Sequence, residues 1–132
     1  MVKLTIKTSH KREVLDITDK INQIIKEQKF ERGVCHLFLT HTTAGLTTAD
    51  LDPGTDQDYL DAFAGMIPKL NYGHPHDPTH MPDHILSSLI GTSLSLPVEN
   101  GELSLGTWQR VVLVELDGPR ERTVILNLLQ SN

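Results

Sequence analysis

Histidines are the chemically prominent residues of this chain. Seven occur among 132 residues, against one tryptophan and one cysteine. Four of them fall within eleven positions of a segment that prolines interrupt, namely His74, His76, His80 and His84. Imidazole is the commonest neutral nitrogen ligand of zinc and similar ions, and catalytic zinc sites pair three protein ligands with an open position. The cluster indicates either a metal site or a solvated loop that binds ions weakly, because its spacing matches no tight metal signature.

The turn that begins at His41 is a second candidate. His41 ends an apolar stretch and is followed by Thr42, Thr43, a small residue and a glycine. Hydroxyls and backbone N–H groups that a glycine leaves accessible can receive phosphate or carboxylate oxygens. The same residues can also form an ordinary turn in which His41 bonds a backbone carbonyl. The pattern therefore has two interpretations: a turn that contacts an anion, or a turn whose role is only structural.

Two arginines could bind the same anion. Arg120 and Arg122 follow a turn at residues 117–119 and project to one side if the strand has already begun. A pair of guanidinium forks matches a phosphate or a diphosphate. In the alternative interpretation, Glu115 and Asp117 hold both arginines in ion pairs.

Asp50 and Trp108 are weaker candidates. Asp50 is the acidic residue nearest to the His41 turn, so it could act as a general base or orient a ligand. Capping of the following helix explains most of the acidic run around it equally well. Trp108 opens a long predicted strand, and its ring could stack on a planar heterocycle, although a lone tryptophan more often belongs to the core.

The spacing of apolar residues predicts the elements that must position these side chains. Alternation over residues 2–7 is typical of a half-buried strand, and residues 13–17 are predicted to pair with it in a hairpin. Helical spacing predicts a helix over 18–28. The remaining predicted elements are strands at 33–40 and 46–49, a helix ending at Ile67, an irregular loop at 68–82, a helix at 83–90, and strands at 94–98, 103–105, 108–116 and 122–129. This content predicts one α+β domain over residues 1–132, mainly an antiparallel sheet system packed against two or three helices.

Composition narrows the classes of partner. Seventeen acidic residues against twelve Lys and Arg give a net charge of −5, which argues against a surface that follows nucleic-acid phosphates. No apolar run approaches the roughly 18–20 residues that cross a bilayer, and the first residues do not form a signal peptide. A single cysteine, Cys35, excludes an intrachain disulfide and is compatible with a reducing compartment. We therefore expect a cytoplasmic protein without a membrane or nucleic-acid partner.

The order of several short motifs resembles one known family. The chain contains "HTTAGL", "LDP", "NYGH", "DHILSSLIG", "GTWQ" and "DGPRER" in that order. Together they resemble the YjbQ-like family, whose members are also called secondary thiamine-phosphate synthases, and the resemblance covers nearly the whole chain. It implies a compact α+β protein with a β-sandwich-like core, assembled as a homotrimer, with histidines forming a divalent-metal site near a subunit interface.

The resemblance also assigns roles to individual residues. The histidines that match the family motifs are His41, His74 and His84, and these become the predicted metal ligands. His76 and His80 then belong to the loop or support the ligands. Two segments depart from the family pattern: Ala49-Asp50 stands where an Asn-Glu pair is usual, and "THMPD" stands where a Gly-Asn-Ala type of sequence is common.

The activity that the resemblance implies is the formation of thiamine phosphate from hydroxymethylpyrimidine diphosphate and thiazole phosphate, with release of diphosphate. Thr42 and Thr43 would contact phosphate, Trp108 would stack on the pyrimidine, and Arg120 and Arg122 would contact phosphate and assist catalysis. Asp50 is the remaining predicted catalytic residue.

The predicted metal and the predicted reaction do not match each other closely. Three imidazoles favour a zinc-like ion, whereas diphosphate departure commonly uses oxygen-ligated magnesium, which could arrive with the substrate. Two alternatives therefore stay open. One is a metal-dependent hydrolase of a phosphorylated small molecule, and the other is a trimeric binding protein that a metal stabilises and that catalyses nothing.

Overall fold

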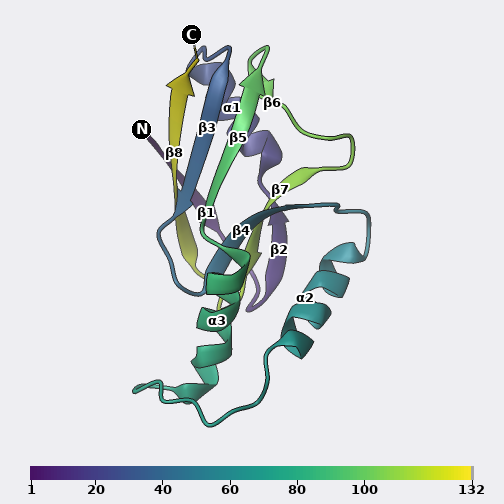
Figure 1. Ribbon diagram of the computed structural model, residues 1–132, viewed down its shortest axis with the longest axis vertical. Coiled ribbons are helices and arrows are strands. Elements are labelled where there is room, and N and C mark those ends of the chain that lie inside the picture. The colour runs from purple at the N-terminus through teal and green to yellow at the C-terminus, as the bar shows by residue number, and fades with distance from the viewer. Residues whose placement is uncertain (132) are drawn as a thin grey trace.

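The computed structural model describes residues 1–131 as two antiparallel sheets with three α-helices. The larger sheet has the order β1-β8-β3-β5-β6 and the smaller one the order β2-β7-β4 (Figure 1). The elements are β1 (Val2–Lys7), β2 (Glu13–Asp16), α1 (Thr18–Glu27), β3 (Gly33–Leu39), β4 (Ala44–Ala49), α2 (Thr55–Met66), a 3₁₀ turn η1 (Pro78–His80), α3 (Met81–Ile90), β5 (Ser93–Glu99), β6 (Glu102–Leu103), β7 (Arg110–Glu115) and β8 (Glu121–Gln130). The predicted α+β class is confirmed.

The predicted opening hairpin is wrong. β1 pairs with β8 in the larger sheet, whereas β2 pairs with β7 in the smaller one. The polar segment between β1 and β2 therefore carries the chain from one sheet to the other instead of folding it back on its neighbour. Local alternation predicted both strands correctly, but the choice of partner depends on which core each apolar face meets.

The smaller sheet lies between two hydrophobic cores. On one face of β7, Val111 and Leu113 join the core that the two sheets and α1 enclose. On the other face, Val112 and Val114 join a second core with side chains of α2 and α3. Because both faces are covered, β7 is a continuous apolar run rather than an alternating one. Figure 1 shows α2 and α3 in the lower half of the view, away from the chain ends.

Helix α3 is fixed on the start of β4. A Cβ built on Gly45 would lie 2.7 Å from Cγ2 of Ile90, so only glycine permits this approach. The hydroxyl of Ser87 donates to the carbonyl of Ala44 at 2.7 Å. The N–H of Leu46 donates to the carbonyl of Gly91 at 2.9 Å. These contacts bring α3 against the segment that contains His41.

We expect Gly45→Ala to lower the free energy of unfolding by about 1–3 kcal/mol, the usual cost of overpacking a core. The added methyl would push α3 away from β4, because Ile90 and the backbone of Gly91 occupy the space. Urea denaturation measures the change. Gly65→Ala in α2 is the matched control, since its Cβ would enter open space. Equal stability of the two variants would contradict the close approach of α3.

No helix in the described part of the chain is both long and apolar enough to cross a membrane.

Candidate functional site

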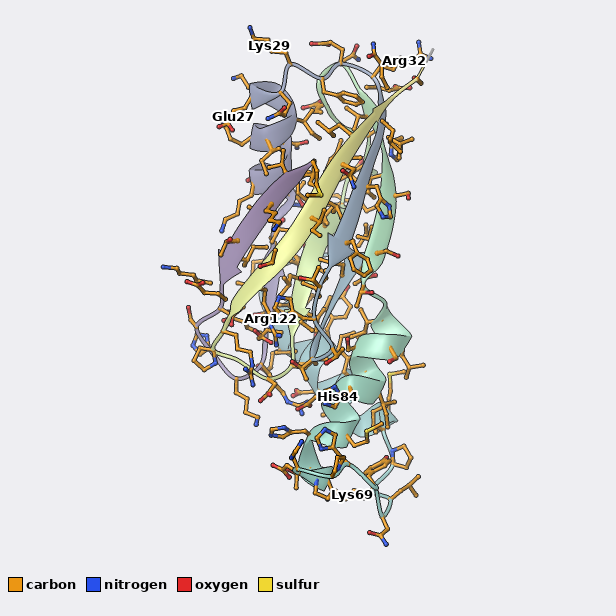
Figure 2. All side chains as sticks on the ribbon, turned by 90° about the vertical axis from the view of Figure 1, so that its left-hand side faces the viewer. Glu27, Lys29, Arg32, Lys69, His84 and Arg122 are labelled. Carbon is orange, nitrogen blue, oxygen red and sulfur yellow. The ribbon has the colours of Figure 1, made fainter. Side chains whose placement is uncertain are left out.

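A cavity of about 750 Å³, here called the histidine cavity, forms where four segments meet. These segments are the β3–β4 turn, the loop before α3, the first turns of α3, and the β7–β8 turn with the start of β8. Figure 2 shows His84 on α3 and Arg122 on β8 in this lower region of the molecule. The lining residues are Thr40, His41, Thr42, Thr43, His74, His76, His80, His84, Asp117, Arg120, Glu121 and Arg122. Most of the predicted site residues therefore lie together.

A hydrogen bond from one ring nitrogen fixes the orientation of His84, and the other ring nitrogen can bind a proton or a metal ion. Its Nδ1 lies 2.9 Å from the carbonyl oxygen of Thr42. Since a carbonyl can only accept, Nδ1 carries the proton and donates, and Nε2 of the neutral ring has a lone pair. Histidines that bind metals or move protons are commonly oriented by such a bond.

His41 is held in the same tautomer as His84, but its Nε2 is occupied. The backbone N–H of Thr123 donates to its Nε2 at 2.9 Å, so in the neutral ring the proton sits on Nδ1. Burial lowers the pKa of His41, and the positive charges of Arg122 and Arg120 lower it further against the opposing effect of Glu115. His41 is therefore neutral at neutral pH and keeps its bond to β8.

His74 packs beside His84 and is tied to its own loop. The two ring centroids are 5.2 Å apart, with planes inclined by 13°. The backbone N–H of Asp77 donates to Nδ1 of His74 at 3.1 Å, so in the neutral ring Nε2 carries the proton. His76 and His80 flank His74 with centroid distances of 6.1 and 6.3 Å.

This arrangement does not fit a three-imidazole metal site on His41, His74 and His84. A metal ligand needs an unprotonated ring nitrogen, and typically donates its other N–H to a carbonyl or carboxylate. Only His84 is bonded in this way. The other two rings accept backbone N–H groups and would have to release them first. Within residues 1–131, no group of three or more His, Cys, Asp or Glu side chains is arranged to hold a metal ion.

Both arginines form the ion pairs of the alternative interpretation. Arg122 is 1% exposed and pairs with the fully buried Glu115, donating from Nε at 2.9 Å and also from Nη2. Its Nη2 further donates to the carbonyl and hydroxyl oxygens of Thr43, at 3.1 and 2.9 Å. Arg122 thus supports the wall of the cavity by positioning Thr43.

Arg120 keeps access to the cavity. Its side chain is 52% exposed, and it bonds the Asp117 carbonyl from Nε at 2.8 Å and the Asp117 carboxylate from Nη2 at 2.9 Å. Burial raises the pKa of Asp117, but the hydrogen bond and charge of Arg120 outweigh it and the pKa is lowered. This anchored and half-exposed guanidinium is the arginine that a ligand could reach.

Asp50 and Trp108 lie elsewhere. Together they line a separate cavity of about 440 Å³, here called the tryptophan cavity, with Thr48, Ala49, Gly106, Thr107 and Gln109. β7 begins at Arg110, so Trp108 does not open a strand as predicted but lies in the preceding turn, 73% exposed. At about 3.3 Å per strand residue, β4 separates Asp50 from Thr43 by about 23 Å. Asp50 is the acidic residue that follows His41 most closely in sequence, yet it lies at the far end of β4 from the histidine cavity.

The sequence did not indicate that three further side chains line the histidine cavity, namely Thr40, Asp117 and Glu121. Asp117 was considered only as an ion-pair partner of the arginines, and so was Glu115. A charged residue that ends the apolar run of β7 is the signal that could have identified Glu115 as a buried anchor, because such a residue needs a partner of opposite charge.

Comparison with known proteins finds one family over nearly the full length. A family model described as UPF0047 protein YjbQ-like matches residues 2–131. A UPF0047 protein of Archaeoglobus fulgidus is 35% identical over 130 residues, which cover 97% of this chain and 100% of the relative. The UPF0047 protein YugU of Bacillus subtilis is 35% identical over 127 residues, covering 96% of each chain.

Solved structures show the same fold. An uncharacterised conserved protein of the YjbQ/UPF0047 family from Clostridium acetobutylicum has a TM-score of 0.87 at 34% identity, covering 98% of this chain and 100% of that one. A YbjQ-like protein of unknown function from Sulfolobus solfataricus has a TM-score of 0.90 at 30% identity, covering 98% and 96%. The match of sequence and of fold extends over both sheets and all four segments of the histidine cavity, and the chain belongs to the YjbQ-like UPF0047 family.

Proposed function

We propose that the histidine cavity binds phosphorylated small molecules and catalyses a thiamine-phosphate synthase reaction, which joins hydroxymethylpyrimidine diphosphate to thiazole phosphate and releases diphosphate. One observation supports this most. A single cavity combines His84, whose Nδ1 is fixed on Thr42, with the half-exposed guanidinium of Arg120. Guanidinium and hydroxyl groups donate to phosphate and diphosphate oxygens, as does an imidazole that carries its second proton, and a cavity of this size can hold such a ligand.

The reaction asks mainly for stabilisation of charge. The carbon–oxygen bond to diphosphate breaks with its electron pair on the leaving group, and positive charge develops on the pyrimidine side until the thiazole phosphate adds. Arg120 would bind the departing diphosphate, and Nε2 of His84, when it carries a proton, would donate that proton to the diphosphate oxygen on which negative charge develops. Thr43 accepts from Arg122 through its hydroxyl oxygen, which leaves its hydroxyl proton to donate to the ligand.

A zinc-like ion is the competing proposal for Nε2 of His84, which cannot bind a metal and carry a proton at the same time. His41 and His74 could join as ligands only after they release the backbone N–H groups of Thr123 and Asp77, and magnesium would arrive on the diphosphate. If this metal proposal holds, elemental analysis of the purified protein gives close to one transition metal per chain, and much less in His84→Ala. His36→Ala is the control, because His36 lies on β3 and bonds Ser95 outside the cavity. Full metal content in His84→Ala, or none in the parent protein after reconstitution, would contradict the metal proposal.

The predicted homotrimer would give Asp50 and Trp108 a role that one chain alone does not permit. Because β4 separates them from the histidine cavity of their own chain, they could reach a ligand there only from a neighbouring copy. We expect His84→Ala and Trp108→Ala each to be inactive alone and partly active after mixed reassembly. Activity that never returns in mixed oligomers, with unmixed controls run in parallel, would exclude a shared site.

The proposed reaction is tested directly by supplying both substrates with Mg²⁺ and separating the products by chromatography. Thiamine phosphate and diphosphate appearing in equal amounts would support the proposal. Diphosphate or phosphate released at the same rate without thiazole phosphate would favour the hydrolase alternative. Substrate binding without any turnover would favour the binding protein.

A further inference from the structure

A second hollow opens on the other side of the His41 turn. It has a volume of about 410 Å³ and lies between the end of β3 and the C-terminal turn of α3. We call it the Phe38 groove; its lining residues are Phe38, Leu39, Thr40, His41, Thr42, Ser87, Ser88, Gly91 and Thr92. Thr40, His41 and Thr42 line the histidine cavity as well, so the turn at residues 40–42 is a wall that both hollows share.

The groove differs from the histidine cavity in its chemistry. No arginine, lysine or carboxylate is among its lining residues, and His41 is its only histidine within the described chain. Phe38 faces away from the core, between the buried neighbours Leu37 and Leu39, and is 43% exposed. An aromatic ring beside small side chains is suited to pack against a planar, uncharged group.

Hydrogen bonds inside the fold determine what the groove hydroxyls can still do. Ser87 donates to the carbonyl of Ala44 at 2.7 Å, and Ser88 donates to the carbonyl of His84 at 3.0 Å. Thr40 donates to the carbonyl of Thr123 at 3.3 Å. Ser87 is 2% exposed and serves the fold, whereas the exposed Ser88 and Thr40, with their protons used, offer a ligand acceptor lone pairs. They therefore favour a ring that carries N–H donors, such as an amino group.

The groove is preformed on both walls. The N–H of Leu39 donates to the carbonyl of Thr92 at 2.7 Å, and the N–H of Leu46 donates to that of Gly91 at 2.9 Å. These bonds tie the segment after α3 to β3 and to β4, so that no rearrangement is needed to open the groove. Its volume is within the range of about 300–1,000 Å³ that is usual for small-molecule sites.

We propose that the Phe38 groove holds the uncharged, amino-bearing ring of the phosphorylated substrate whose phosphates occupy the histidine cavity. This proposal rests on the function proposed above and goes beyond it, because it makes Phe38 rather than Trp108 the aromatic contact of the same chain. The 40–42 turn lies at the junction between the ring and the phosphates. The two hollows are thus two parts of one bipartite site.

Binding of two ligands tests the inference. The probes are inorganic diphosphate, which has no ring, and hydroxymethylpyrimidine diphosphate, which has an aminopyrimidine ring; isothermal titration calorimetry gives both Kd values. We expect Phe38→Ala to weaken binding of the pyrimidine diphosphate about tenfold and to leave binding of inorganic diphosphate unchanged. Ser88→Trp, which fills the groove from α3, is expected to have the same selective effect.

Val34→Ala is the matched control, because Val34 faces outward on the same strand, is 37% exposed and lines neither hollow. Circular dichroism and thermal melting establish that each variant is folded. Equal Kd values for the pyrimidine diphosphate in parent, Phe38→Ala and Ser88→Trp would overturn the groove proposal while leaving the phosphate site intact. Failure of the parent protein to bind inorganic diphosphate would instead overturn the proposed phosphate site, and with it the bipartite site.

Discussion

Glu115→Ala is expected to lower the free energy of unfolding by about 3–5 kcal/mol, because it leaves Arg122 charged and buried without a partner. Glu115 is completely buried and Arg122 is 1% exposed. The carboxylate also accepts the hydroxyl of Thr8 at 2.7 Å and the N–H of Leu116 at 3.0 Å, so the variant loses several bonds at once. Urea denaturation followed by circular dichroism measures the loss.

Glu121→Ala is the control for this prediction. Glu121 pairs with Lys7 at 3.7 Å, and the two side chains are 66% and 80% exposed. An exposed pair of this kind contributes about 0–1 kcal/mol. If Glu115→Ala were no more costly than Glu121→Ala, the buried pair could not be the anchor that positions Thr43.

The buried pair also predicts how stability depends on pH. Burial raises the pKa of Glu115, but hydrogen bonds from Arg122, Thr8 and the N–H of Asp117, together with the charge of Arg122, outweigh burial and lower the pKa below its ordinary value of 4.5. A carboxyl whose pKa is lower in the folded state than in the unfolded state stabilises the fold at higher pH. Its contribution is therefore complete above the unfolded pKa and is lost as the pH falls through the folded one. Glu115→Gln removes the charge, so its stability should approach that of the parent at low pH.

Local patterns predict the elements of this fold but not how they pair. Apolar alternation in Val2–Lys7 and the short run Glu13–Asp16 was sufficient to predict two strands. Their partners are β8 and β7, from the far end of the chain, because each strand joins the sheet whose core its apolar face completes. Nothing in the turn between them reports that the chain changes sheet there.

The sequence predicts which residue types form the site, but not which of their ring nitrogens are engaged in hydrogen bonds. Motif order was enough to predict that His41, His74 and His84 lie together. The ring nitrogens that remain available depend on backbone N–H groups of Thr123 and Asp77, whose positions only the folded chain determines. Asp50 was predicted to lie beside the His41 turn because it is the next acidic residue in the sequence. The extended strand β4 connects the two, and an extended strand carries its two ends far apart in space.

The second large effect is expected from His84. His84→Ala should reduce kcat/KM for thiamine-phosphate formation by about 100-fold to 10,000-fold, the usual contribution of a side chain that transfers or holds a proton in the transition state. Its Nδ1 is engaged with the Thr42 carbonyl, so Nε2 is the atom on which this function depends. The cost in folding stability should be small, about 1 kcal/mol for one hydrogen bond.

An amide variant separates the roles of the two nitrogens of His84. In His84→Asn the side-chain amide N–H replaces Nδ1 and can still donate to the Thr42 carbonyl, while nothing replaces Nε2. We therefore expect His84→Asn to keep the stability of the parent protein and to lose activity as fully as His84→Ala. His36→Ala, outside the cavity, should leave both unchanged. Substantial activity in His84→Asn would mean that His84 acts only by positioning Thr42. The chemistry of the cavity would then depend on Arg120 and the threonine hydroxyls.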